Sequence, residues 1–344
     1  EISLGLVGSE MCIRDRKTAS PLVMAYFWYL VENRSSLLIA GGVSTGKTSL
    51  LNSICMFIPP EAKIISIEDT RELRIPHEHW VPTVTRLGFG IPLPTGEKYG
   101  EVTLFDLLKG SFRQNPDYVI VGEVRGKEAY VMFQGMSSGH PCLSTFHAGS
   151  VDTVIKRLTT PPIELSASLV ESLDAIVVMI HAREKGKSAR RIKVVDEIIE
   201  VDPVTNEAKV FSSVEWNPAT DTYKFNEDSY LLKKIAKNKG ISIEEVKKEI
   251  RRREKVLEWM WKKGIKDYVE VCKIINEYYK NPEKLLEKIG VKELEKEEVE
   301  KVEEAKKEIE EKTEALPEYC PYCGNKFEPE DLYCTQCGRP RKPN

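Results

Sequence analysis

The sequence predicts an α/β fold organised around a parallel β-sheet, and three observations support this prediction. Short apolar runs of strand length alternate with helical or loop segments, as they do when helices cover both faces of a parallel sheet. One of these runs leads into a glycine-rich segment that ends in Gly46-Lys47-Thr48. The chain of 344 residues is also long enough for one sizeable domain with smaller pieces attached.

Five apolar runs are expected to form the parallel strands: residues 37–40, 64–67, 118–121, 142–146 and 175–180. The segments that follow, "ARRIKVVDEIIEVD", "EAKVFSSVEW" and "DTYKFN", alternate apolar and polar residues and are separated by turn residues. They are predicted to be antiparallel strands that either extend the sheet or form a small flap.

A helical region is expected over residues 236–290. Ser242 and Glu245 have the spacing of a capping box at the start of its first long helix, and Gly264 is expected to end that helix. A second helix and a short third helix should follow. The apolar positions of the first helix follow helical spacing at Ile243, Val246, Ile250, Leu257 and Trp261.

Two segments are set apart from this core. Residues 1–16 lack an initial Met and a clear period, and they look like a translated sequencing adapter. We therefore expect them to be non-native, which would make the chain a fragment without its true N-terminal part.

Residues 291–316 are predicted to form a charged helical linker, because 291–315 hold 11 Glu and 6 Lys. A coiled coil is the alternative, but the apolar spacing is irregular.

The segment "LLIAGGVSTGKTSLL" predicts a phosphate-binding loop between a strand and a helix. The backbone N–H groups of such a loop point at phosphate oxygens, assisted by the positive end of the helix. Lys47 is expected to reach the β- and γ-phosphates, and Thr48 is expected to ligate Mg²⁺. The expected nucleotide-binding residues are Gly41, Gly42, Val43, Ser44, Thr45, Gly46, Lys47, Thr48 and Ser49.

Acidic residues end two further strands. Glu68 and Asp69 follow the second run, at the edge where ligands bind in parallel sheets. A carboxylate there can orient and deprotonate an attacking water, although helix capping or simple surface exposure is the alternative. Glu123 follows the third run, where Mg²⁺ and its waters need negative charge, and Arg125 offers a fixed cation nearby.

His140 and His147 flank the fourth run, one at each end. A single His in such a position is more often structural than functional. Because two of the five His of the chain flank one strand, a functional role is as well supported as a structural one.

Together these segments resemble the type II/IV secretion-system ATPase family, the RecA-like hexameric motors of secretion, pili and archaella. "GGVSTGKTS" is similar to the Walker A loop, "IEDTRELRIPH" to the Asp box, "VIVGEVRG" to the Walker B strand and "GHPCLSTFHAGS" to the His box. "SPLVMAYFWYLVENRSSLLIAGG" and "RLTTPP" look most like the archaeal branch. The resemblance implies a RecA-like P-loop NTPase domain over residues 17–235.

The resemblance also implies roles and partners. Glu68 would be the catalytic base, Glu123 would act with Thr48 at Mg²⁺, and His147 would join them as a catalytic residue. ATP and Mg²⁺ would be bound by a homo-hexamer, which passes its motion to a polytopic membrane platform protein that adds subunits to a filament. The implied location is cytoplasmic and peripheral, at the inner face of the cell membrane.

The chain departs from the family pattern in three places. Gly126 stands where many members have an acid, which leaves the partner of Arg125 open, and Gly149-Ser150 replaces Asn-Ser or Asp-Ser. We also expect the N-terminal domain to be missing, and with it arginines that reach the nucleotide. The fragment is therefore expected to bind nucleotide but to assemble and hydrolyse it poorly. The residues considered for phosphate or intersubunit contacts, with surface ion pairs as the alternative, are Arg71, Arg74, Arg86, Arg113, Arg125 and His140.

The end of the chain, residues 317–344, predicts a zinc ribbon. Two copies of Tyr-Cys-x-x-Cys-Gly place Cys320, Cys323, Cys334 and Cys337 as ligands of one Zn²⁺. The core expected for it comprises only Tyr319, Tyr322, Phe327 and Tyr333, so the metal must supply its folding energy. We expect the ribbon to dock an unknown partner.

Two rival functions are open at this stage: a DNA-handling motor of conjugation or recombination, and a nucleotide-gated scaffold without catalysis. The net charge of −3, the pI of about 6.1 and the lack of a basic-aromatic groove argue against nucleic-acid binding. The longest apolar run near the start, Pro21 to Val31, is too short for a membrane span of roughly 20 residues.

Overall fold

The computed structural model describes residues 18–91, 98–184, 187–290, 318–328, 331 and 333–340. The chain divides into two compact units, one ending at Leu285 and one beginning at Leu286, and each is described by itself. The predicted linker 291–316 and the adapter-like residues 1–16 lie outside the described residues.

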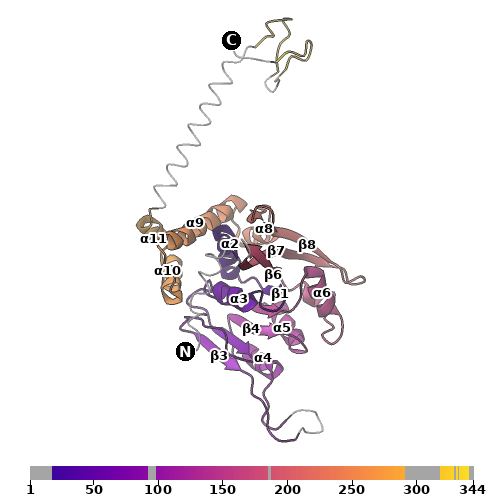
Figure 1. The fold of residues 1–344 in the computed structure, drawn as a ribbon, viewed down its shortest axis with the longest axis vertical. Coiled ribbons are helices and arrows are strands. Elements are labelled where there is room, and N and C mark those ends of the chain that lie inside the picture. The colour runs from indigo at the N-terminus through magenta and orange to yellow at the C-terminus, as the bar shows by residue number, and fades with distance from the viewer. Residues whose placement is uncertain are drawn as a thin grey trace. The chain divides into compact units, whose positions relative to one another are not determined.

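The first unit is built on one mixed sheet (Figure 1). Within the described residues it has nine strands in the order β3-β2-β4-β5-β1-β6-β7-β8-β9. The pairs from β3 to β6 are parallel and those from β6 to β9 are antiparallel. The strands are β1 Leu37–Gly41, β2 Ile64–Glu68, β3 Trp80–Val84, β4 Tyr118–Val124, β5 Cys142–Phe146, β6 Ala175–Glu184, β7 Lys187–Val201, β8 Ala208–Asn217 and β9 Thr222–Phe225.

The predicted α/β class and the five parallel strands are confirmed, and the three antiparallel segments extend the sheet. Strand β3 was missed because Pro82 interrupts a half-exposed run that shows no clear alternation. Proline is tolerated there because β3 is the edge strand and pairs only with β2.

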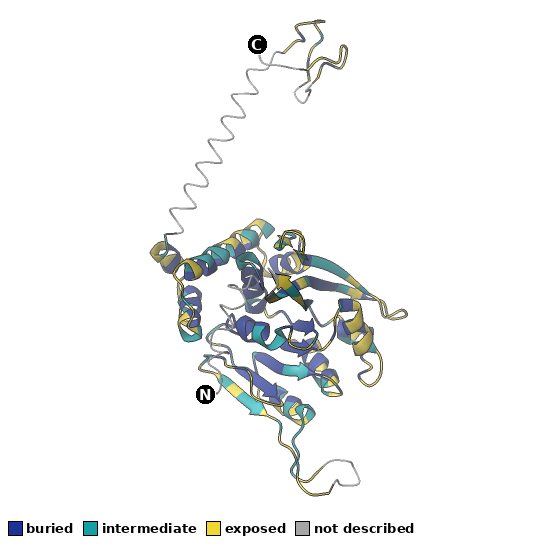
Figure 2. Cartoon of the chain, viewed as in Figure 1, coloured by how far each residue is buried: buried dark blue, intermediate teal, exposed yellow. Residues whose placement is uncertain are grey.

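Helices cover both faces of the sheet. The helices of the described residues are α2 Pro21–Glu32, α3 Lys47–Cys55, α4 Leu104–Phe112, α5 Glu128–Ser137, α6 Val151–Thr159, α7 Ala167–Val170, α8 Tyr230–Lys239, α9 Ile243–Lys262, α10 Tyr268–Lys280 and α11 Pro282–Lys288. Helix α2 begins at Pro21 behind an Ser20 cap and is buried over nine consecutive residues (Figure 2). Such all-round burial is typical of a helix inside a large core. No helix in the described ranges is long and apolar enough to cross a membrane.

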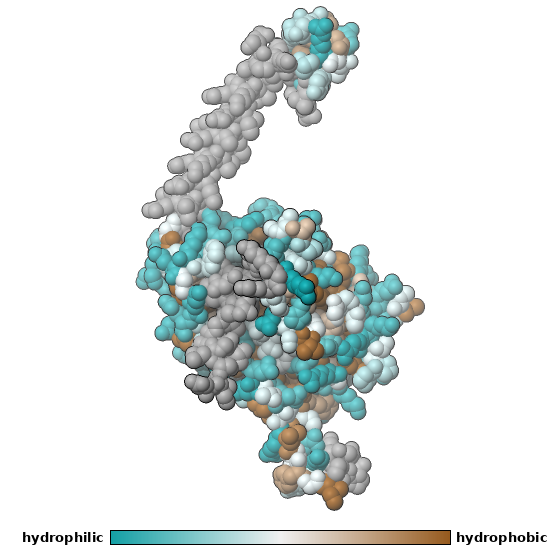
Figure 3. Space-filling model, in the orientation of Figure 1, coloured by the Kyte–Doolittle hydropathy of each residue, from teal (hydrophilic) through white to brown (hydrophobic). Residues whose placement is uncertain are grey.

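An arm, defined as residues 85–91 and 98–102, projects from the edge of the sheet. It is held by bridges from Arg86 to Val102 and from Phe89 to Tyr99. Its apolar side chains are exposed, with Leu87 90% and Ile91 89% accessible, and Figure 3 shows apolar residues on this projection. The arm starts directly behind Glu68, because the backbone N–H of Thr85 donates to the Glu68 carbonyl.

Helix α9 has the predicted capping box, since Ser242 accepts from the backbone N–H of Glu245 and the Glu245 carboxylate accepts from that of Ser242. Trp261 was expected on its apolar face, but its exposed fraction is 49%. The expectation is wrong because the buried face is centred on Arg253, Val256 and Met260, and Trp261 lies at the margin of that stripe.

Arg253 joins α9 to α2 from inside the protein. Its side chain is 3% exposed and pairs with the carboxylates of Glu32 and Glu249. The guanidinium carbon lies 5.1 Å from the ring centre of Trp28 and 5.7 Å from that of Tyr278. The packing of the helical region on the sheet domain therefore depends on a buried cation among aromatic rings.

Replacing Arg253 by Ala is expected to lower the free energy of unfolding by about 3–5 kcal/mol, because two carboxylates would lose their buried cation. Urea denaturation of the 344-residue chain measures this. Arg251→Ala is the matched control on the same helix: it removes ion pairs of a side chain that is 49% exposed and should cost under about 1 kcal/mol. Equal losses for the two variants would contradict the structural role of Arg253.

Candidate functional site

The glycine-rich segment forms a loop between β1 and α3, as the sequence predicts. The helix begins at Lys47, and both Ser44 (φ 58°) and Gly46 (φ 93°) adopt left-handed backbone conformations. Left-handed residues turn consecutive backbone N–H groups toward one side of a loop, which makes an anion-binding concavity at the helix N-terminus. The arrangement fits the phosphates of a nucleotide.

Close packing explains why the loop needs glycine at its start. A Cβ atom on Gly41 would lie 2.5 Å from Thr45 Oγ1 and 2.9 Å from the Met179 carbonyl oxygen. Thr45 Oγ1 and Lys47 Nζ both donate to the Gly42 carbonyl, at 3.0 and 2.9 Å. Lys47 Nζ is thus held over the loop, where it could donate to a phosphate oxygen in place of the Gly42 carbonyl.

The electrostatic environment of Lys47 includes Glu123. Burial lowers the pKa of the Lys47 ammonium, and the negative charge of Glu123 partly opposes that shift. Lys47 is the first residue of α3, which follows β1, and Glu123 lies in β4. Strands β1 and β4 are separated by β5 in the sheet. The charge of Glu123 is therefore close enough to act on Lys47 at the loop.

Glu68 is a buried carboxylate with one oxygen held and one oxygen left over. Its residue is 3% exposed, and Oε1 accepts from the backbone N–H groups of Glu72 and Leu73, both at 2.9 Å. Oε2 is buried and has no hydrogen-bond partner within the described residues. Burial raises the pKa of this carboxyl, while the two backbone N–H groups act in the opposite direction. An oriented carboxylate with a vacant acceptor is suited to hold and deprotonate a water.

Gly122 brings Glu68 against the end of β4. A Cβ atom at Gly122 would lie 3.2 Å from the Cγ atom of Glu68. The Gly122 carbonyl in turn accepts from Thr145 Oγ1 at 2.7 Å, which joins the ends of β4 and β5. The ends of β2, β4, β5 and β1, which are adjacent in the sheet, thus carry Glu68, Glu123, His147 and the phosphate loop.

Arg125 pairs with Glu123, which identifies the partner that Gly126 had left open. The Glu128 carboxylate accepts from the backbone N–H groups of Arg125 and Gly126, at 2.6 and 2.7 Å. Arg125 is 67% exposed and Glu123 only 25%. The pair places a cation on the open side of the acid, where an incoming phosphate would meet it.

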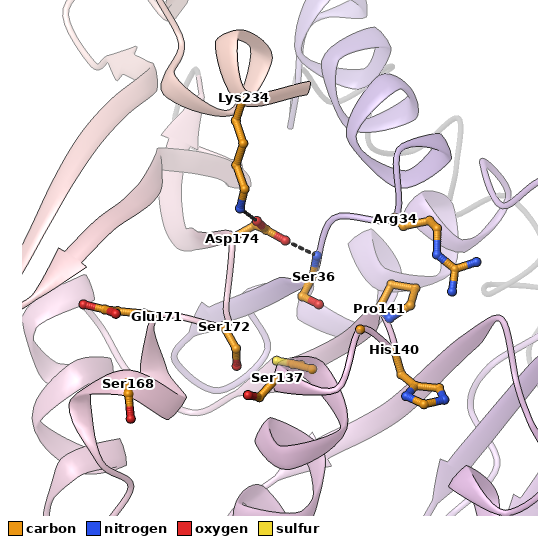
Figure 4. A pocket seen from close by; sticks show the side chains of 12 residues that line it. Arg34, Ser36, Ser137, His140, Pro141, Ser168, Glu171, Ser172, Asp174 and Lys234 are labelled. Atoms are coloured by element: carbon orange, nitrogen blue, oxygen red, sulfur yellow. Dashed lines mark hydrogen bonds and ion pairs between the residues drawn. The ribbon is translucent and has the colours of Figure 1, made fainter. Parts of the chain in front are cut away.

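His140 lies at the opposite end of β5 from the phosphate loop. It lines a cavity of about 360 Å³ with Arg34 and the Asp174–Lys234 ion pair (Figure 4). Because β5 and β1 are parallel, His140 and the loop are separated by about 16 Å of strand. This separation does not favour a phosphate contact from His140 within the same chain. Its contact with phosphate or with a neighbouring subunit stays a prediction. Arg113 also lies toward the amino ends of the parallel strands, because it follows α4 just before β4 begins.

Three other arginines lie near the carboxyl edge but have contacts of their own. Arg71 stacks over the Trp80 ring at 5.0 Å, and the backbone N–H of Arg74 donates to Asn52 Oδ1 at 2.9 Å. Arg86 Nε donates to the Gly100 carbonyl at 2.7 Å, inside the arm. Their proposed contacts with phosphate or a neighbouring subunit remain predictions.

Two residues that contact the loop were not found from the sequence. His181 Nε2 lies 3.0 Å from the Val43 carbonyl oxygen, and Arg190 Nε donates to the Ser44 carbonyl at 3.0 Å. They belong to β6 and β7, in a stretch without a recognisable motif. Only the strand register, which the sequence does not reveal, brings them to the loop.

The second unit brings the four predicted cysteines together. Their Sγ atoms all lie within 4.8 Å of one another. A tetrahedral Zn²⁺ site with Zn–S bonds of about 2.3 Å requires sulfur separations of roughly 3.8 Å, so the cluster fits the metal. Each knuckle is closed by a glycine with positive φ, Gly324 at 74° and Gly338 at 70°. Phe327 is buried as expected, but Tyr319, Tyr322 and Tyr333 are more than half exposed and do not form a core.

The comparisons with known proteins agree with this geometry. A family model described as Type II/IV secretion system protein matches residues 19–313. The chain is 44% identical over 263 residues to the uncharacterized protein MJ1287 of Methanocaldococcus jannaschii, covering 76% of this chain and 95% of that protein.

More distant relatives have names that refer to secretion. The type IV secretion system protein PtlH of Bordetella pertussis is 35% identical over 177 residues, which cover 48% of this chain and 50% of PtlH. The crystal structure of the VirB11 ATPase of the Brucella suis type IV secretion system, in complex with sulphate, is 25% identical. It covers 54% of each chain with a TM-score of 0.43. Since the family model spans most of the sequence, the chain belongs to the type II/IV secretion system protein family.

Proposed function

We propose that this chain binds Mg²⁺-ATP at the carboxyl edge of its sheet and hydrolyses it. The observation that carries the proposal is the buried Glu68 carboxylate, whose unpartnered Oε2 lies on the same edge as the phosphate loop. Bound Mg²⁺ would neutralise phosphate charge, with Thr48 and Glu123 as its ligands or the ligands of its waters. Lys47 holds phosphate oxygens, and Glu68 orients the attacking water and accepts its proton.

We further propose that hydrolysis does mechanical work. Family membership and the similarity to PtlH, which is named as a type IV secretion system protein, support a secretion or filament-assembly motor. The chain would act as a homo-hexamer on a polytopic membrane platform protein, at the cytoplasmic face of the cell membrane. His147, exposed at the end of β5, is proposed to assist at the γ-phosphate or at the subunit boundary.

A motor assembled from several copies has a concentration-dependent rate, because each site is completed by a neighbouring subunit. ATP turnover per subunit by the 344-residue chain is therefore expected to rise steeply with protein concentration and then level off. Phosphate release measured beside sedimentation velocity would relate the rise to assembly. A control without Mg²⁺ should give no turnover at any concentration.

Turnover per subunit that stays constant while the protein changes from monomer to oligomer would overturn the assembling motor but keep the ATPase. Tight ATP binding without turnover at any concentration would favour the non-catalytic scaffold. Binding of single-stranded DNA with a steep dependence on salt would favour the DNA-handling motor.

A further inference from the structure

The antiparallel extension of the sheet contacts the phosphate loop from outside. His181 in β6 and Arg190 in β7 are directly opposite each other in the strand register. Both side chains meet the loop at adjacent residues, His181 at the Val43 carbonyl and Arg190 at the Ser44 carbonyl, each at 3.0 Å. We call these two residues the loop brace.

The loop brace contacts backbone carbonyls that a phosphate-binding loop directs away from its ligand. When consecutive N–H groups turn inward to meet an anion, the carbonyls between them turn outward and need donors. Ser44 itself is in the left-handed conformation, with φ at 58°, which is uncommon for a residue other than glycine. The donors from β6 and β7 contact the loop at and beside this residue.

Close packing adds to the hydrogen bonds. A Cβ atom on Gly46 would lie 3.0 Å from Arg190 Cδ, so the arginine side chain lies directly over the last glycine of the loop. Gly46 also has a φ of 93°, so glycine is needed there for both reasons. Arg190 is thus fixed against the loop by its stem as well as by its guanidinium.

We propose that His181 and Arg190 are positioning residues, which hold the phosphate loop in its binding conformation and so raise its affinity for the diphosphate portion of a nucleotide. The inference rests on the proposed function, because it assumes that this loop binds ATP. A preformed loop binds its ligand more tightly, since less conformational freedom is lost on binding. Arg190 Nε is directed at a loop carbonyl, so its proposed action on the nucleotide passes through the loop.

The experiment compares ADP and ATP affinity in variants of the 344-residue chain, measured by calorimetric titration. Arg190→Ala is expected to weaken both nucleotides about tenfold, and His181→Ala about threefold, in line with the loss of a charged and a neutral hydrogen bond. His181→Gln and Arg190→Lys keep a donor at a similar reach and should recover most of the affinity. The control is Arg183→Ala. Arg183 is an exposed residue of β6, the strand that carries His181, and the variant should bind nucleotide as the wild type does.

The remaining outcomes separate this inference from its foundation. If the wild-type chain binds neither nucleotide, the proposed function itself fails. If the wild type binds and Arg190→Ala binds equally well, the loop brace is wrong and the site stands. A loss confined to ATP would also overturn it, because a contact with the γ-phosphate weakens ATP alone, whereas a disordered loop weakens ADP and ATP equally. Thermal denaturation without nucleotide identifies a variant that is simply unfolded, and the Gln and Lys variants then carry the test.

Discussion

Replacing Glu68 by Gln is expected to slow ATP turnover by about 10²–10⁴-fold, the range typical of a lost general base. The amide has the shape of the carboxylate, and its oxygen can still accept from the backbone N–H groups of Glu72 and Leu73. What it loses is the basic oxygen that corresponds to the buried Oε2. ATP affinity should therefore stay near the wild-type value while the chemical step fails.

The pH dependence follows from the raised pKa of Glu68. A general base works in its ionised form, so turnover should rise as pH increases through a pKa above the ordinary Glu value of about 4.3. The fold favours the protonated form of this carboxyl, so its contribution to stability is largest below the ordinary pKa and decreases as pH rises through the raised one. In Glu68→Gln, the rise of turnover with pH at the acid side of the profile (the acid limb) should disappear. The decrease of stability as pH rises through the raised pKa should disappear as well.

The matched control is Glu72→Gln. Glu72 is an exposed carboxylate four residues away, and its backbone N–H, which holds Glu68, is unchanged by the substitution. It should keep turnover and an acid limb, which moves to slightly lower pH because the Glu72 charge contributes to the raised pKa of Glu68. A Glu68→Gln enzyme with the wild-type rate and profile would show that the base is another residue.

Removing zinc is expected to unfold the ribbon while the first unit keeps its structure. Among the described residues of the ribbon, the buried apolar cluster consists of Phe327 with Cys320 and Cys334. Such a core cannot support folding, so the metal must supply it, on the order of 10–16 kcal/mol by analogy with zinc-finger peptides. Metal analysis should give one zinc per chain, and chelation should collapse the NMR shift dispersion of the ribbon residues.

Cys320→Ala should abolish zinc binding, whereas Cys272→Ala should leave it intact. Cys272 is a buried cysteine of the first unit whose Sγ contacts the Pro76 carbonyl at 3.5 Å, far along the chain from the ribbon. A ribbon that keeps its chemical-shift dispersion after chelation would refute the zinc assignment.

The sequence was sufficient for those parts of the fold that local pattern determines. Apolar runs such as 142–146 are buried on both sides, so their length and composition alone identify them as strands. The cap at Ser242 and the stop at Gly264 follow from backbone hydrogen bonding and positive φ within a few residues. The phosphate loop and the cysteine knuckles belong to the same class, because their chemistry requires a fixed local spacing.

What the sequence could not supply is set by contacts between distant segments. Strand β3 forms by pairing with the edge of β2, and its own residues lack the alternation that would predict a strand. Trp261 continues the apolar spacing of its helix, but the face of α9 that is buried includes Arg253 and leaves Trp261 exposed. His181 and Arg190 reach the loop through strand register, and the distance of His140 from the loop follows from strand direction.

The most direct test of the central claim, that the carboxyl edge of the sheet is a hydrolytic nucleotide site, is one paired measurement. ATP affinity and single-turnover hydrolysis would be determined for the wild type, Glu68→Gln and Lys47→Ala under the same conditions. Glu68→Gln is expected to bind ATP without hydrolysing it, and Lys47→Ala is expected to lose affinity. Equal hydrolysis by the wild type and Glu68→Gln would contradict that claim.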